Sequence, residues 1–464
     1  MLRSVLESND QTEMLMTPLG FVVVLVAVAV LASRRGYPQL LAAAAGLPIG
    51  VVATVAGQSA KTFFVLGAGA CAWLVFRWII AREDVRPTIQ EHRPGAIALV
   101  LFLCWSIFVT ILAPTIFEGM PVLVARGGID EQFLDPGTLT YTVSNVAQVS
   151  YLIVSVGVVF FLARSPGTSP GLLGITLTVI TVISFWRLLS LNAGLPFPEG
   201  FFDNSTTVRI IEQTPDGEPR FRGIFSEPSG LGAASLTTLV FFALRIPRLT
   251  GWQRLGALVV LIMAAANAAS STAGTFVAAG LILIAIAFLV WVGRFLLNKT
   301  RVDPIFAGAV ILLIAIGLLF VPLLVAFVES VISVKISSSS FYSRTGADQF
   351  SYLLTLNTWG FGVGLGSNRP SSFLAALFSC TGVLGVALFT LAVGKLMTAA
   401  SANSEYHATI WALVSVLVCK VVANPDISDN PAFLWISCGV LAHAAWRGSY
   451  DDAAVTSTPS FARV

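Results

Sequence analysis

The chain has 464 residues, of which 56% are hydrophobic and only 11% are charged. Soluble proteins carry about 25% charged residues, so this composition excludes a protein that could cover its whole surface against water. Several apolar runs reach the roughly 20 residues that a membrane-spanning helix needs. The runs are continuous rather than alternating, which argues against a membrane β-barrel. The composition therefore predicts an all-α polytopic membrane protein.

The apolar runs predict about 13 transmembrane helices, within a range of 12–14. They form a single transmembrane domain over residues 1–446, and a disordered cytoplasmic tail is expected over 447–464. No signal peptide is evident in the polar first sixteen residues. The expected spans are 17–33, 38–56, 62–81, 95–113, 143–163, 171–190, 229–245, 255–270, 273–296, 305–328, 372–394, 407–423 and 431–446.

Basic residues orient the spans, because cytoplasmic loops of membrane proteins are enriched in Lys and Arg. Alternate loops contain or adjoin such residues, among them Arg34, Arg93, Arg164, Arg248 and Arg447. These loops are predicted to be cytoplasmic. Three long loops then face the periplasm, at about 114–142, 191–228 and 329–371.

The first of these long loops is acidic, but the other two are basic. The expected outer side carries eight cationic residues against the usual bias: Arg187, Arg209, Arg220, Arg222, Lys335, Arg344, Arg369 and Lys420. An anionic ligand at that face is the simplest physical reason for them.

The third long loop has its own pattern. Apolar residues between Thr345 and Trp359 recur at near-helical spacing, which predicts an amphipathic helix in the plane of the interface. Alternating glycines then run from Gly360 to Gly366, and they allow close backbone approach to a ligand or to a neighbouring helix. Ser371 and Ser372 offer an N-cap for the next span.

The segment from Arg220 to Ser229 is the first candidate site. Arg220 and Arg222 could bind a phosphate or pyrophosphate through their guanidinium forks, with Ser226 beside them and Glu227 placed to accept a proton. The alternative interpretation is a structural salt bridge from Arg222 to Glu227 that caps the following span. The two interpretations are compatible.

Further candidates lie elsewhere at the expected outer face. Arg344, which follows Tyr342, could be a second anion clamp or could reach lipid phosphates, and Arg369 is the next candidate. Ser271 lies in a Ser/Thr turn that could line a sugar or phosphate site, or could simply allow close helix packing. Arg187 could line a polar cavity, or could merely extend its guanidinium to the interface. Lys420 could belong to a site with the Asp426 turn, or pair with Asp426 in an ordinary turn.

Neither the cysteines nor the histidines have metal-ligand spacing, so we expect no metal and no cofactor. The histidines His92, His407 and His443 fall on the expected cytoplasmic side. A mechanism that needs a periplasmic His base is therefore disfavoured.

Taken together, these residues resemble the Wzy-type O-antigen and exopolysaccharide polymerases. The likeness covers roughly residues 140–445 and is carried by the segment from Arg222 to Ser229 before a span, by the Ser270–Gly274 turn and by the Gly360–Arg369 segment. Members of that family can have an Arg followed sixteen positions later by a Gly in a periplasmic loop. Arg344 and Gly360 match this spacing, and so do Arg369 and Gly385.

The resemblance implies a GT-C-like fold in the bacterial inner membrane and glycosyl transfer at the periplasmic face. The substrate would be an oligosaccharide repeat unit on undecaprenyl pyrophosphate, with membrane lipids, a chain-length regulator and a flippase as other partners and no nucleic acid. O-antigen ligases share the fold but have a periplasmic His, which favours a polymerase here. A transporter or flippase is the remaining alternative, although its charges should lie at mid-membrane.

Overall fold

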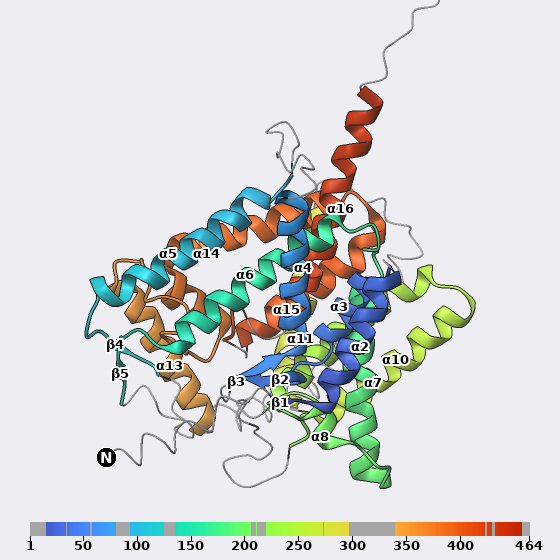
Figure 1. The fold of residues 1–464 in the computed structure, drawn as a ribbon, viewed down its shortest axis with the longest axis horizontal. Helices are drawn as coiled ribbons and strands as arrows, with labels where there is room; N and C mark the ends of the chain where they lie inside the picture. The colour runs from blue at the N-terminus through green and yellow to red at the C-terminus, as the bar shows by residue number, and fades with distance from the viewer. Residues whose placement is uncertain are drawn as a thin grey trace, which may run out of the picture.

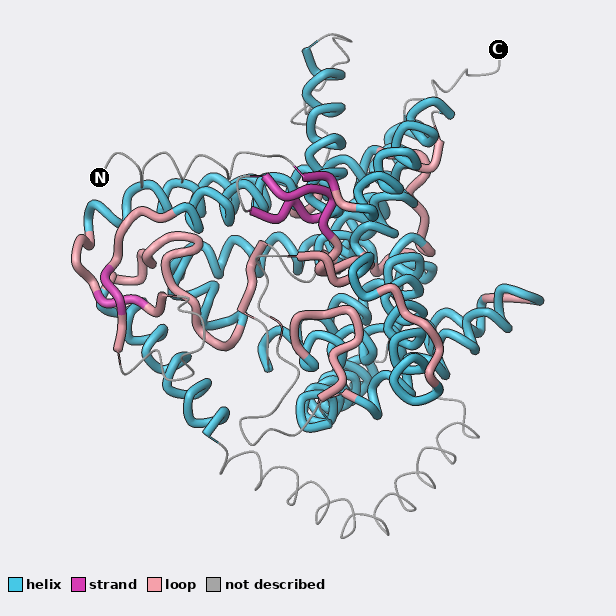
Figure 2. Tube along the Cα trace, turned by 60° about the horizontal axis from the view of Figure 1, so that its bottom comes forward, coloured by secondary structure: helices cyan, strands magenta, loops and turns pink. Residues whose placement is uncertain are grey.

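The structure is a computed structural model that describes residues 15–33, 35–55, 58–79, 93–124, 135–205, 210, 220–271, 273–296, 339–422, 425–428 and 432–456. It is mostly helical, and Figure 2 shows strands in two small patches only. The longer helices are α2 (Pro18–Ser33), α4 (Thr62–Ile79), α5 (Ala96–Ile116), α6 (Val143–Arg164), α7 (Leu172–Ala193), α9 (Pro228–Arg245), α10 (Gly251–Ser270), α11 (Ala273–Leu296), α13 (Ser339–Asn357), α14 (Phe373–Ala400), α15 (His407–Val422) and α16 (Phe433–Thr456).

Length and composition support a multi-pass membrane protein. Within the described residues, eight helices are long and apolar enough to cross a membrane, and shorter apolar helices cover Pro18–Ser33, Ala278–Gly293 and Phe433–Trp446. Eleven of the predicted spans therefore coincide with apolar helices. The predicted span at 305–328 lies outside the described residues.

The predicted span at 38–56 is wrong as a continuous helix. The helix α3 covers only Tyr37–Ala45, and the chain then enters the strands β2 (Val51–Val55) and β3 (Gln58–Lys61). These strands form a three-stranded antiparallel sheet with β1 (Leu15–Met16). The physical reason lies in residues 46–55, where two glycines, a proline and several β-branched residues favour extended backbone over helix.

The helices pack as a bundle around one large apolar core (Figure 1). The most extensive pairs are α6 with α16, α9 with α15, α5 with α14, and α9 with α10. The remaining short elements are β4 (Pro121–Val122), β5 (Gly137–Thr138), α8 (Glu199–Phe202), η2 (Ile246–Arg248) and η3 (Ser404–Tyr406). The helix α16 continues past residue 446, where the last span was expected to end.

The helix predicted in the third loop is confirmed as α13, whereas its place in the plane of the interface stays a prediction. It packs against α14 and buries Leu354, while Leu353 and Leu356 are exposed. Asp348 on α13 accepts hydrogen bonds from the backbone N–H groups of Ser371 and Ser372, at 2.8 and 3.0 Å. The predicted N-cap is confirmed as well, because the Ser372 hydroxyl accepts from the backbone N–H of Ala375.

The alternating glycines after α13 let an extended segment pass between helices. Gly360, Gly362, Gly364 and Gly366 all have positive φ. A Cβ at Gly364 would lie 2.7 Å from the Cα of Thr110 on α5, and real Cβ atoms do not approach so closely. The glycines thus serve close approach to neighbouring helices, one of the two uses that the sequence left open.

Polar side chains fasten this segment inside the bundle. The buried Asn145 of α6 donates to the carbonyl oxygen of Leu365 and to the hydroxyl of Ser367, each at 2.7 Å. Asn368 donates to the hydroxyls of Ser351 and Ser379, both at 2.9 Å. Because nearly all these polar groups are paired, the segment is held as a structural element of the core.

Candidate functional site

Two buried arginines converge on one aspartate near the end of α7. Asp203 Oδ2 accepts hydrogen bonds from Arg187 Nη1, at 2.5 Å, and from Arg222 Nη2. Arg187 Nη1 also donates to the carbonyl oxygen of Gly223 at 2.9 Å, and Arg222 Nη1 donates to that of Phe225 at 2.7 Å. We call Arg187, Asp203 and Arg222 the arginine–aspartate cluster.

Three separate elements bring these side chains together. Arg187 lies in the second-last turn of α7, Asp203 directly follows the short helix α8, and Arg222 begins the turn that precedes α9. Gly223 in that turn has a φ of 56°, and a Cβ there would lie 2.5 Å from the hydroxyl oxygen of Ser184. The turn can therefore lie flat against α7 only with glycine at this position.

The small sheet fixes the position of Asp203. Its neighbour Asn204 exchanges two hydrogen bonds with the backbone of Val51 in β2, at 2.8 and 2.9 Å. Ser205 donates to the hydroxyl of Ser59 in β3 at 3.3 Å. The strands found in place of the expected second span therefore anchor the loop that carries the carboxylate.

Burial makes the charges of this cluster mutually dependent. Arg222 is 3% exposed, Arg187 is 7% exposed, and the side chain of Asp203 is 7% exposed. A buried charge is costly unless a partner compensates it, so each arginine needs this carboxylate. Glu199 Oε1 lies 3.4 Å from Arg187 Nη2, but its side chain is 65% exposed and contributes less.

One oxygen of the cluster has no hydrogen-bond partner. Asp203 Oδ1 is buried and accepts no hydrogen bond from any described residue. Buried polar atoms are nearly always satisfied, so an unpaired carboxylate oxygen has capacity to accept from a bound hydroxyl or water.

Aromatic side chains flank the cluster. Phe197 lies beneath the Arg187 guanidinium, with 5.8 Å from Cζ to the ring centroid. Trp186 contacts Phe197 and Phe202 edge to face, and its indole N–H donates to the carbonyl oxygen of Pro196. Trp186 is still 38% exposed. Such an aromatic group, with an apolar body and a polar tip, suits a membrane–water interface.

The residues that follow the cluster lie at the start of α9. Glu227 is the residue before Pro228, the first residue of α9, and proline is well tolerated there because its missing N–H is not needed. The Glu227 carboxylate accepts from the hydroxyl of Ser229 at 3.3 Å. Arg220 is exposed, and Ser226 is half-buried.

The predicted salt bridge between Arg222 and Glu227 does not form, because Arg222 points to Asp203 instead. Asp203 is the residue that sequence reasoning missed. The sequence did contain a signal for it, because Asp203 is an acidic residue that ends an aromatic stretch in the same loop as Arg222.

The third loop does not join this cluster. Arg344 and Tyr342 lie on α13, which packs against α14 on the other side of the bundle from α7 and α8 (Figure 1). Arg369 is exposed, and its backbone N–H donates to the carbonyl oxygen of Leu123. The structure therefore separates the arginines of the two basic loops.

Lys420 is buried within the bundle. Its Nζ donates to the backbone carbonyl oxygen of Asp426 at 2.6 Å and lies 4.9 Å from the centroid of the Phe373 ring. The contact with Asp426 thus forms through the backbone rather than the carboxylate. The hydrogen bond in this tight turn and the cation–π contact offset much of the free-energy cost of burying the Lys420 ammonium.

Ser271, directly after α10, makes packing contacts within the bundle. Its hydroxyl donates to the carbonyl oxygen of Ala268 at 2.9 Å, and a Cβ at Gly232 of α9 would lie 3.4 Å from the same hydroxyl oxygen. These contacts favour the close-packed turn over a ligand site.

No group of three or more His, Cys, Asp or Glu side chains that could hold a metal ion occurs within the described ranges. No known protein-family profile and no curated protein sequence matches this chain.

Proposed function

We propose that this protein is a glycosyltransferase that polymerises oligosaccharide repeat units carried on undecaprenyl pyrophosphate, at the periplasmic face of the bacterial inner membrane. The observation that carries the proposal is the arginine–aspartate cluster. It places buried positive charge and an unpaired carboxylate oxygen at one end of a bundle of apolar helices. The family resemblance and a GT-C-like fold are part of the same proposal.

In this proposal the cluster positions the groups that meet the substrate. Arg222 fastens the turn between Asp203 and Phe225, and Arg220 lies exposed two residues before it. Arg220 would contact the pyrophosphate, assisted by the backbone N–H groups at the N-terminus of α9. A well-placed donor of this kind contributes roughly 3 kcal/mol to stabilising the leaving group.

The transfer itself would proceed by attack of an acceptor sugar hydroxyl on the anomeric carbon of the donor. The new carbon–oxygen bond forms as the bond to the pyrophosphate oxygen breaks, and the lipid pyrophosphate leaves with the electron pair. Glu227 would take the hydroxyl proton, and the unpaired Asp203 Oδ1 could orient a sugar hydroxyl. The lipid tail stays in the bilayer, so the reaction belongs at the interface.

The position of the buried histidine supports a polymerase rather than a ligase. His443 of α16 is buried, and its Nδ1 lies 3.1 Å from the carbonyl oxygen of Ala163, at the end of α6. The short connection from α6 to α7 places that end opposite to Arg187, which lies near the far end of α7. A ligase-type mechanism would need a His beside the cluster.

The decisive experiment incubates the purified protein with lipid-linked repeat units and separates the products by size. A ladder formed without a second acceptor supports the polymerase. Product on a distinct acceptor alone would instead identify a ligase. Movement of intact repeat units across vesicles, with no new glycosidic bond, would identify a flippase.

Two matched variants test the role of the arginines. In Arg222→Lys a single amine cannot reach both Asp203 and the carbonyl oxygen of Phe225, so we expect turnover to fall at least tenfold. Arg344→Lys tests the clamp predicted for the third loop. Full activity in Arg222→Lys would remove the positioning role of Arg222 from the proposal, and full activity in Arg344→Lys would remove the clamp predicted for the third loop.

A further inference from the structure

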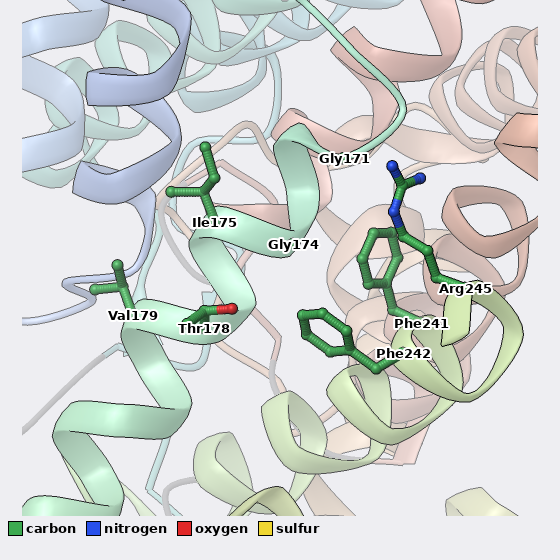
Figure 3. A pocket seen from close by; sticks show the side chains of 8 residues that line it. All are labelled: Gly171, Gly174, Ile175, Thr178, Val179, Phe241, Phe242 and Arg245. Atoms are coloured by element: carbon green, nitrogen blue, oxygen red, sulfur yellow. The ribbon is translucent and has the colours of Figure 1, made fainter. Parts of the chain in front are cut away.

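An open pocket lies between the start of α7 and the end of α9, at the opposite end of α7 from the arginine–aspartate cluster. Its volume is about 310 Å³, near the lower limit of pockets that bind small ligands. In Figure 3, Phe241, Phe242 and Arg245 of α9 face the start of α7, where Gly171 precedes the helix and Gly174 lies in its first turn. Gly171 and Arg187 are 16 positions apart, which corresponds to about 24 Å along a helix.

The pocket is apolar except at one end. Phe241 and Phe242 form one wall, and Thr178 points toward the Phe242 ring from the other (Figure 3). A Cβ at Gly174 would lie 3.0 Å from Phe241, so the glycine lets the Phe241 ring pack closely against α7. The apolar part extends for about two helical turns, which matches the depth over which the interface gives way to acyl chains.

The Arg245 guanidinium closes the polar end of the pocket. It is half-buried and lies 5.9 Å from the centroid of the Phe241 ring, yet it makes no hydrogen bond or ion pair with any described residue. A Cβ at Gly171 would lie 3.1 Å from Arg245 Nη2, so the guanidinium lies over the first turn of α7. Guanidinium groups held near apolar surface without a partner favour an anionic ligand.

Two charged side chains lie near Arg245, and Glu405 has a larger influence on it than Arg248. Arg248 and Glu405 lie within electrostatic range of Arg245, one of each sign, and the N-terminus of α7 adds a positive partial charge. Arg245 ends α9 and Arg248 ends η2, at the side that the sequence predicts to be cytoplasmic, where anionic phospholipids attract basic residues.

We propose that this pocket binds one anionic phospholipid, with its phosphate on the Arg245 guanidinium and the start of an acyl chain along Phe242 and Thr178. The guanidinium supplies the charge recognition and the apolar walls supply the chain recognition. A free phosphate would leave those walls empty, and an uncharged lipid would leave Arg245 unpaired.

The test measures lipid retention by native mass spectrometry of the full chain in detergent. We expect phosphatidylglycerol to be retained over phosphatidylcholine, and millimolar inorganic phosphate not to displace it. Arg245→Gln should weaken phosphatidylglycerol binding about tenfold or more, because a hydrogen bond to a charged group is lost. Thr178→Phe should also weaken it, since the ring would occupy the acyl path while all charges stay in place.

The matched control is Arg248→Gln, which removes the same charge from an exposed position outside the pocket lining. An equal loss in Arg248→Gln and Arg245→Gln would overturn the proposal in favour of diffuse surface attraction. Equal retention of the two lipids by the unaltered protein, or displacement by inorganic phosphate, would overturn it as well. These two measurements need no variant, so they decide the question even if a substitution impairs folding.

Discussion

Replacing Asp203 by asparagine is the sharpest test of the arginine–aspartate cluster. The substitution keeps the shape of the side chain but removes the only carboxylate that both Arg187 and Arg222 contact among the described residues. Among the described residues, Arg187 then keeps the carbonyl oxygen of Gly223 and the exposed Glu199, and Arg222 keeps the carbonyl oxygen of Phe225. We expect a folded but clearly destabilised protein.

The magnitude follows from burial. Removing one partner of a buried ion pair typically costs about 3–5 kcal/mol, because the remaining charge is uncompensated. The carbonyl contacts and the exposed Glu199 offset part of that cost here, so we expect a loss of about 3 kcal/mol. Glu199→Gln is the matched control. Its carboxylate is 65% exposed, so we expect a loss of about 1 kcal/mol or less.

The free energy of unfolding would be measured for the purified protein in mixed micelles, by titration with denaturant. Combining Asp203→Asn with Arg222→Gln should cost less than the sum of the two single substitutions, because the double variant removes one of the stranded charges. A loss for Asp203→Asn no larger than that for Glu199→Gln would refute the reasoning. Strict additivity in the double variant would do so too.

Three further predictions concern packing and topology. Gly364→Ala should destabilise the protein by several kcal/mol, because Gly364 has a positive φ and the new Cβ would collide with the α5 backbone. Gly394→Ala, in open space within α14, should instead stabilise the protein by about 0.5–1 kcal/mol. Denaturant titration of both variants checks this prediction. Asn145→Leu should lose about 1–3 kcal/mol in the same assay, because a buried carbonyl oxygen loses its donor. Glu199→Cys should react with an impermeant thiol reagent only from the periplasm, and Arg248→Cys only from the cytoplasm; labelling from the same side would contradict the predicted orientation.

Much of the fold follows from local chemistry that a sequence displays. Long apolar runs need helices in a membrane because every backbone polar group must be paired within the segment. The N-cap at Ser372 and the amphipathic helix before Gly360 could be predicted as well. Each of these depends on residues within a few positions of one another.

The second expected span shows where apolar content alone misleads. Residues 38–56 are apolar enough to cross a membrane, but the helix ends at Ala45 and the chain passes through turns into the strand Val51–Val55. Apolar content predicts burial rather than backbone conformation. The extended form is stabilised by the adjacent strand β3 and by two contacts that are distant in sequence, with β1 and with Asn204.

The local sequence determined that Arg222 lies at the entrance to a helix and that glycines allow close backbone approach. Only the tertiary structure decided what those residues contact. Arg222 pairs with Asp203 rather than Glu227, because β2 and β3 hold the loop after α8 against the end of α7. The arginines of the third loop stay with α13 and α14. A charged side chain pairs with whichever opposite charge the fold brings within reach, and that distance is set by packing between elements far apart along the chain.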